Sequence, residues 1–199
     1  MCGGNVTVGS NPTLSAATAR PSGRADSRHG SGPVPSQAME PVLPADERHD
    51  TWMRAALAEA TAAGMVGEVP IGAVVVHLGD PAGPRIISSR HNERESSSDP
   101  TAHAEVLALR DAAHHLQRWR LDDCLLVVTL EPCPMCAGAA WAARVAGVVF
   151  GASSDDSGAL GTLYHLGQDP RLNHEFPVRA RVCEAECGEL LRSFFGERR

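Results

Sequence analysis

Lysine is absent from this sequence of 199 residues, and aromatic side chains make up only 4% of it. All 18 basic residues are arginines, against 24 acidic residues, so the formal net charge is −6. This balance excludes a protein that binds nucleic acid through a strong overall positive charge. A local arginine patch is still compatible with it, because arginine holds phosphate bidentately and keeps its charge.

Long apolar runs are missing as well. No stretch of about 18 consecutive apolar residues occurs, so we expect no membrane-spanning helix and no membrane partner. The opening residues, MCGGNVTVGSNPTLS, lack a charged stretch followed by an apolar core. We therefore expect a cytoplasmic protein without a secretory signal. In that compartment the six cysteines are metal ligands or free thiols rather than disulfides.

Large apolar side chains are scarce in residues 1–45, which are rich in Gly, Pro, Ser and Ala. Such a segment cannot bury enough surface to offset the entropy of ordering it, so we expect a disordered leader over 1–45. Residues 46–199 carry enough apolar side chains for one globular domain.

Apolar periodicity in this second part predicts helices alternating with strands, and hence a layered α/β domain around one sheet. We expect strands over residues 71–77, 85–90, 125–130, 147–151 and 176–182. We expect helices from about 46 to 64 or 67, from a Thr101 cap to about 115, from Pro132 to 144, and from 184 to about 195. Polar loops are expected at 91–100 and 152–176.

Two short segments, each at the start of a predicted helix, carry a metal-ligand pattern: TAHAE at 101–105 and EPCPMC at 131–136. His103, Cys133 and Cys136 offer one imidazole and two thiolates, a donor set that suits Zn²⁺. Three protein ligands leave a fourth position open, which is typical of catalytic rather than structural zinc. A lone CxxC pair or a lone HxE can arise by chance, but their combination at two helix starts favours a zinc site.

Glu105 is then a neighbour of the metal rather than a ligand. Zinc lowers the pKa of a bound water from about 15.7 toward about 7, and a carboxylate beside that water can accept and pass on its proton. Residues i and i+2 do not share a helix face. His103 must therefore lie at the mouth of its helix if it and Glu105 are to reach one cavity.

His-x-Glu followed by Pro-Cys-x-x-Cys is the signature of zinc deaminases that act on cytosine or adenine. Over nearly all of 50–199 the sequence closely resembles the bacterial tRNA-specific adenosine deaminases. The resemblance rests on Trp52-Met53-Arg54, EVPIGAVVV, HNERESSSDPTAHAEVLALRDA, VTLEPCPMCAGA, VVFGA and the final SFFGERR. It implies a cytidine deaminase-like fold, which is a three-layer α/β/α domain around one mixed five-stranded sheet.

The resemblance also implies a reaction, in which adenosine at the wobble position of a tRNA anticodon is hydrolysed to inosine by a homodimer. Zinc-bound hydroxide would attack C6 of adenine, with Glu105 as the proton shuttle. By the family pattern, the side chain of Asn92 touches the target base, the backbone of Ala104 contacts its edge, and Ile71 lines the pocket. The alternative is that Asn92 is a turn residue, but we favour the contact with the base.

An acidic chain needs local arginines to hold the phosphates of a tRNA. Arg94, Arg198 and Arg199 are the candidates, and Phe194 or Phe195 can offer a stacking face. The alternative is that both phenylalanines pack the last helix onto the sheet and that the arginines are a solvated chain end. Cys183 and Cys187 have no suitably spaced histidine, so we expect buried thiols there. Cys124 precedes a predicted strand, so we expect it in the core.

Two other functions are compatible with these residues. One is a deaminase of free bases or nucleosides, such as guanine or cytosine, on the same fold. The other is a non-catalytic zinc module that binds RNA, which would need a fourth protein ligand and would have no use for Glu105.

Overall fold

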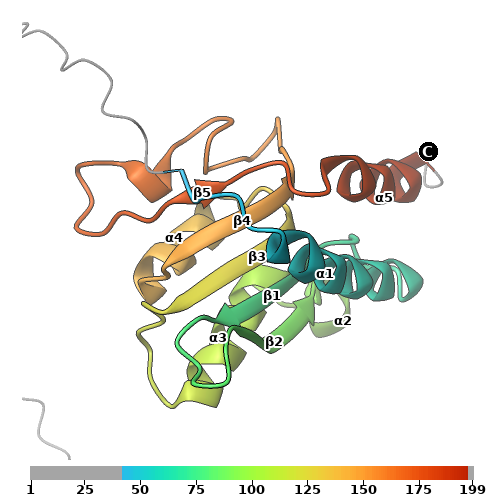
Figure 1. Cartoon of the computed structure of the whole chain (residues 1–199). Helices are drawn as coiled ribbons and strands as arrows, with labels where there is room; N and C mark the ends of the chain where they lie inside the picture. The colour runs from blue at the N-terminus through green and yellow to red at the C-terminus, as the bar shows by residue number, and fades with distance from the viewer. Residues whose placement is uncertain (1–41, 197–199) are drawn as a thin grey trace, which may run out of the picture. The chain divides into compact units, whose positions relative to one another are not determined.

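The β-branched runs pair into a single sheet in the computed structural model, which describes residues 42–196 (Figure 1). In chain order the elements are α1 (Arg48–Met65), β1 (Gly72–His77), β2 (Arg85–His91), α2 (Arg94–Ser97), α3 (Ala104–Leu116), β3 (Cys124–Leu130), α4 (Pro134–Ala143), β4 (Gly147–Ala152), the 3₁₀ turn η1 (Leu166–Gln168), β5 (Val178–Arg179) and α5 (Glu184–Gly196).

The sheet has the order β2-β1-β3-β4-β5. β1 is antiparallel to both β2 and β3, whereas β3, β4 and β5 run parallel to one another. Parallel neighbours need a crossover connection, and α4 supplies it between β3 and β4. The mixed five-stranded sheet is therefore confirmed.

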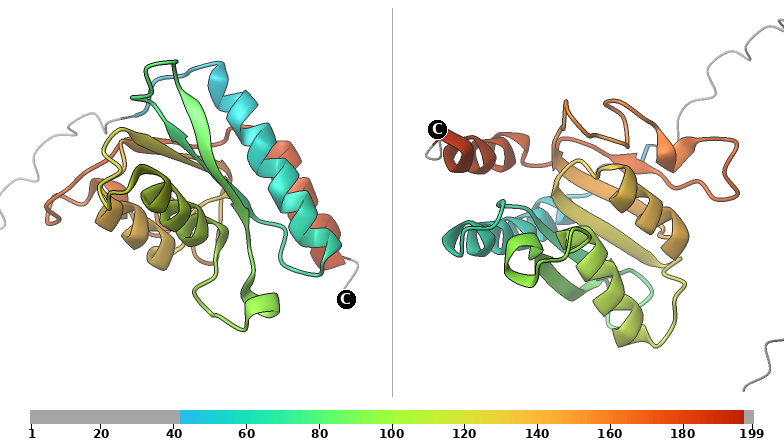
Figure 2. Two further views of the ribbon diagram at one scale, coloured as in Figure 1. Left: turned by 90° about the horizontal axis from the view of Figure 1, so that it is seen from below. Right: turned by 180° about the vertical axis from the view of Figure 1, so that it is seen from behind.

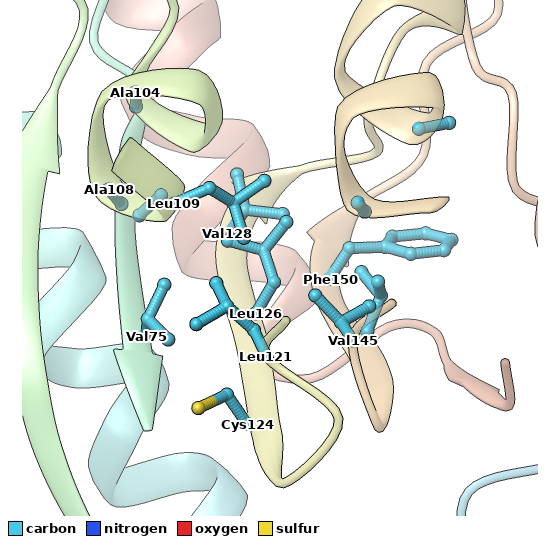
Figure 3. Packing of buried hydrophobic residues seen from close by; sticks show 14 of the residues in the cluster. Val75, Ala104, Ala108, Leu109, Leu121, Cys124, Leu126, Val128, Val145 and Phe150 are labelled. Atoms are coloured by element: carbon cyan, nitrogen blue, oxygen red, sulfur yellow. The ribbon is translucent and has the colours of Figure 1, made fainter. Parts of the chain in front are cut away.

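Helices cover both faces of this sheet, as the left view of Figure 2 shows: α1 and α5 lie on one side, α3 and α4 on the other. Successive strand side chains point to opposite faces. In β1, Val75 accordingly joins the core under α3 and α4, while Val74 joins the core under α1. Figure 3 shows Val75, Leu126 and Val128 on the strands of the first core, on the side where α3 carries Ala108 and Leu109. The three-layer arrangement is thereby confirmed.

α1 approaches the sheet very closely at Gly72. A Cβ built on Gly72 would lie 2.0 Å from the carbonyl oxygen of Ala56 and 2.5 Å from the amide nitrogen of Ala60. Ala56 and Ala60 are themselves fully buried. The alanine-rich sequence of this helix therefore allows backbone-to-backbone packing that a larger side chain on either element would prevent.

The two helices that carry the metal-ligand pattern begin later than predicted. Thr101 does not cap α3, because its hydroxyl donates to Asp99 in a turn (2.7 Å), and His103 is the residue before the helix. α4 starts at Pro134 rather than at Pro132. A residue before proline is driven out of the helical region, and Cys133 is extended, with φ −71° and ψ 171°.

Two further segments differ from the prediction. The loop expected at 91–100 contains the one-turn helix α2, where the buried carboxylate of Glu68 accepts a hydrogen bond from the amide of Ser96 (2.8 Å). The last strand is shorter than 176–182, because Arg181 takes a left-handed backbone conformation (φ 65°) that ends the pairing. Val42 and Leu43 pair with Val178 of β5.

Candidate metal centre

The N-terminal ends of α3 and α4 carry the three predicted ligands. His103 immediately precedes α3, Cys133 immediately precedes α4, and Cys136 is the third residue of α4. Both helices lie on the same face of the sheet (Figure 2). The positive ends of two helix dipoles therefore favour thiolates at this place.

The three side chains converge as one metal requires. Their donor atoms all lie within 4.8 Å of one another, and His103 Nδ1 is 3.5 Å from Cys136 Sγ and 3.9 Å from Cys133 Sγ. Tetrahedral zinc, with bonds of about 2.3 Å to sulfur and about 2.0 Å to nitrogen, places these atoms about 3.5 Å apart. Within residues 42–196, no other group of three histidine, cysteine or acidic side chains meets this condition.

The protonation states fit an exchange of protons for a metal ion. A hydrogen bond from the Cys136 thiol, followed by one with His103, lowers the pKa of Cys133 to about 4. The same bond to Cys133 and the burial of Cys136 raise the pKa of Cys136. The Cys133 thiolate also raises the pKa of His103. Cys133 is thus already a thiolate that can bind a cation, whereas Cys136 and His103 release protons when they bind the metal.

Glu105 completes the site without joining the ligands. It is 4% exposed in the first turn of α3, and burial raises the pKa of its carboxyl group. Its Oε2 atom has no hydrogen-bond partner among the described residues. His103 is extended and lies at the mouth of the helix as predicted, so the poor i, i+2 geometry of a helix does not apply.

This donor set fits zinc. One nitrogen and two sulfur ligands with a fourth position open match a catalytic zinc site, and the unpartnered buried oxygen of Glu105 supplies the acid-base group that a structural site lacks. Zinc bound there lowers the pKa of a water molecule toward about 7.

The residues predicted to form the pocket are linked directly to this centre. Asn92 is 2% exposed, and its Oδ1 accepts a hydrogen bond from the amide of Ala104 (2.9 Å). The amide of Asn92 in turn donates to the carbonyl of Ile71 (3.1 Å). The structure therefore brings Ile71, Asn92 and Ala104 together next to His103.

The other predicted contacts lie apart from this group or outside the described residues. Phe195 is 50% exposed near the end of α5 and makes an edge-on contact with Phe194, with ring centroids 5.3 Å apart. Arg94 is exposed in α2. Arg198 and Arg199 lie outside the residues that the structure describes.

Sequence reasoning missed one buried acid beside the ligands. Glu131 is 2% exposed and follows β3 directly, two residues before Cys133. The available signal was a charged residue between an apolar strand and a proline. Such a residue must find buried hydrogen-bond donors, but the sequence does not indicate which segment supplies them.

Comparisons with known proteins agree with this geometry. Residues 46–152 match the family model of the cytidine and deoxycytidylate deaminase zinc-binding region. The tRNA-specific adenosine deaminase of Bacillus subtilis (strain 168) is 47% identical over 150 residues, which cover 75% of this chain and 90% of that protein. The protein of the same name from Haemophilus influenzae is 43% identical over 161 residues, covering 81% and 91%.

Solved structures place the fold in the same group. A structure described for A-to-I editing by tRNA:A34 deaminases matches with a TM-score of 0.66 and 38% identity, over 71% of this chain and 99% of that one. A guanine deaminase from Nitrosomonas europaea matches with a TM-score of 0.61 and 26% identity, over 78% and 87%. The His103, Cys133 and Cys136 cluster and the buried Glu105 lie inside the matched region, and the chain belongs to the family that shares the cytidine and deoxycytidylate deaminase zinc-binding region and, within it, to the tRNA-specific adenosine deaminases.

Proposed function

We propose that this protein is a hydrolase that converts adenosine to inosine at the wobble position of a tRNA anticodon. The observation that carries the proposal is Glu105, a buried carboxyl group with an unpartnered oxygen, beside a three-ligand zinc site in a chain whose relatives are tRNA-specific adenosine deaminases. A zinc module that only binds RNA needs neither the open position nor this acid.

Glu105 does the proton transfers in this reaction. Water adds at C6 of adenine and ammonia leaves, so one proton must move from the water to the ring nitrogen and another to the departing amine. Burial raises the pKa of this carboxyl group, which favours its acting as an acid as well as a base, and such proton transfer contributes about 10²- to 10⁴-fold in rate.

The residues around Asn92 are suited to hold the base. Ile71 offers an apolar wall, and the hydrogen bond from the Ala104 amide fixes the side chain of Asn92. In the proposed complex, Asn92 and the Ala104 backbone contact the edge of the adenine. The base must leave its stack to enter such a pocket, which costs little in the single-stranded anticodon loop.

Arginine and aromatic side chains are proposed to hold the rest of the anticodon loop. Exposed Arg94 lies two residues after Asn92, and Phe195 offers an exposed ring. Arg198 is proposed to reach a phosphate. We further propose a homodimer, as the resemblance implies, that works in the cytoplasm. Within residues 42–196, no helix is long and apolar enough to cross a membrane.

The decisive test is substrate choice. Purified, zinc-loaded protein is incubated with an arginine-type tRNA anticodon stem-loop that carries adenosine at the wobble position, and inosine is measured by nucleoside mass spectrometry. The matched control is the same stem-loop with guanosine there, and free guanine, cytosine and adenosine are assayed for ammonia release. Inosine formed only from the adenosine stem-loop supports the proposal. Ammonia from a free base, with no inosine in the stem-loop, would establish a small-molecule deaminase instead.

A further inference from the structure

Glu131 gathers hydrogen bonds from one distant loop. Its Oε1 accepts from the amides of Leu160 and Thr162 (both 3.0 Å), and its Oε2 accepts from the amide of Ser154 (3.1 Å) and from the hydroxyl of Thr162. None of the ion pairs found within residues 42–196 includes this buried carboxylate. Backbone and hydroxyl donors of residues 154–162 therefore take the place of a cationic partner.

The loop fits closely around this carboxylate. A Cβ built on Gly158 would lie 2.4 Å from Glu131 Oε2 and 2.5 Å from its Cδ. Gly158 is not among the glycines with positive φ, so the position requires space rather than an unusual backbone. The carboxylate thus occupies the volume that any side chain at position 158 would fill.

The backbone on either side of Glu131 is held by the same part of the chain. The amide of Ala159 donates to the carbonyl of Pro132 (2.9 Å), and the amide of Glu131 donates to the carbonyl of Ala152 at the end of β4 (2.8 Å). Pro132 is followed directly by Cys133, which is a predicted zinc ligand and precedes α4.

We propose that Glu131 is a positioning residue of the metal centre. Its carboxylate and the 154–162 loop form a clamp that fixes the backbone from which Cys133 reaches the metal. The inference rests on the zinc site that the proposed function also uses, but it does not depend on which substrate is deaminated. Groups that orient metal ligands typically contribute about 10- to 100-fold in metal affinity.

Loss of the negative charge alone could also weaken cation binding, so the variants must separate charge from clamping. Glu131→Gln removes the charge and faces an amide group toward two of the donors. Gly158→Ala keeps the charge but places a methyl group against the carboxylate. Thr162→Val keeps the charge and the backbone while removing one hydroxyl donor.

Asp123→Asn is the matched control, because it also changes an acid to an amide at an end of β3. Asp123 precedes this strand and accepts hydrogen bonds from Arg118 and from His77, the latter at 3.0 Å. It lies eight residues, or roughly 26 Å along an extended chain, from Glu131.

Zinc affinity of the full-length protein is measured by competition with a chromophoric chelator, and the visible spectrum of the Co²⁺-substituted protein reports the ligand geometry. Circular dichroism checks that each variant is folded. We expect at least about tenfold weaker zinc binding and altered Co²⁺ bands for Glu131→Gln and Gly158→Ala. Thr162→Val should weaken zinc binding and alter the Co²⁺ bands to a smaller extent. Asp123→Asn should leave the zinc affinity and the Co²⁺ bands unchanged.

Weaker binding in Glu131→Gln alone would show an effect of charge and overturn the proposal, as would unchanged affinity and spectra in all three variants. These measurements contain no RNA. A failure of the clamp is therefore distinguishable from a failure of the stem-loop assay on the wild-type protein.

Discussion

Glu105 lies next to the three predicted zinc ligands, and burial changes the acidity of its side chain. The side chain starts in the first turn of α3 and is almost fully buried, and this burial raises the pKa of its carboxyl group. The charge of His103 and a hydrogen bond with the Cys136 thiol act in the opposite direction and lower that pKa. A raised pKa favours the protonated form of this carboxyl group, which a residue that both accepts and returns a proton needs.

Replacing Glu105 should separate catalysis from metal binding. We expect Glu105→Ala to keep its zinc, because the three ligands do not include Glu105, and to lose at least about 10²-fold in the rate of inosine formation. Glu105→Gln, which keeps the shape of the side chain, should lose the same activity. Zinc content by atomic absorption and single-turnover rates on the stem-loop test this. Loss of zinc together with activity would show that Glu105 is a ligand.

Zinc uptake should release protons. The raised pKa of Cys136 keeps this thiol protonated at pH 7, and the raised pKa of His103 keeps a part of the imidazole protonated, whereas Cys133, with a pKa of about 4, is already a thiolate. Binding therefore becomes weaker as the pH falls. Calorimetric titration of the apo-protein in two buffers of different ionisation enthalpy should give between one and two protons released per zinc at pH 7. Release of none would contradict this protonation pattern.

At the scale of the secondary-structure elements, α1 and β1 approach each other closely at Gly72. The missing side chain of Gly72 lets the backbone of the helix approach the strand, and fully buried alanines line that contact. This contact holds β1 against α1. Gly138 in α4 is different, because a Cβ there would meet nothing within 4 Å.

A pair of glycine-to-alanine substitutions should therefore have opposite effects on stability. Gly72→Ala must push α1 away from β1 and should lower the free energy of unfolding by about 3 kcal/mol. Gly138→Ala should raise it by about 0.5 to 1 kcal/mol, because alanine is the better helix former. Urea unfolding of both zinc-loaded variants measures this. Equal effects of the two substitutions would mean that the close approach at Gly72 does not limit packing.

On the scale of the whole chain, the question is where the folded part begins. Val42 and Leu43 pair with β5, so the described fold is already in contact with the sheet edge at the first described residue. The family model matches from residue 46 onward. The leader that we predicted over 1–45 falls mainly outside the described residues and stays a prediction.

Two truncations test this boundary. Removing residues 1–38 should leave the deamination rate and Tm unchanged, because the composition of the leader predicts that it is disordered. Removing residues 1–44 also deletes the Val42 and Leu43 pairing and should lower Tm by a few degrees, since about 1 kcal/mol shifts Tm by roughly 2–4 °C in a domain of this size. If the shorter truncation already unfolds the protein, the leader is part of the fold.

The amino-acid sequence was sufficient to predict a histidine and two cysteines that fit zinc, the order of the strands and of the helices other than the one-turn α2, and the layered α/β class. These follow from side-chain chemistry, close spacing and apolar periodicity, which are local properties. Tertiary structure decided which loop surrounds Glu131 and how closely α1 approaches β1. Those features depend on contacts between residues far apart in the chain, such as Glu131 with Thr162 or Gly72 with Ala56, and side-chain spacing along one segment contains no information about them.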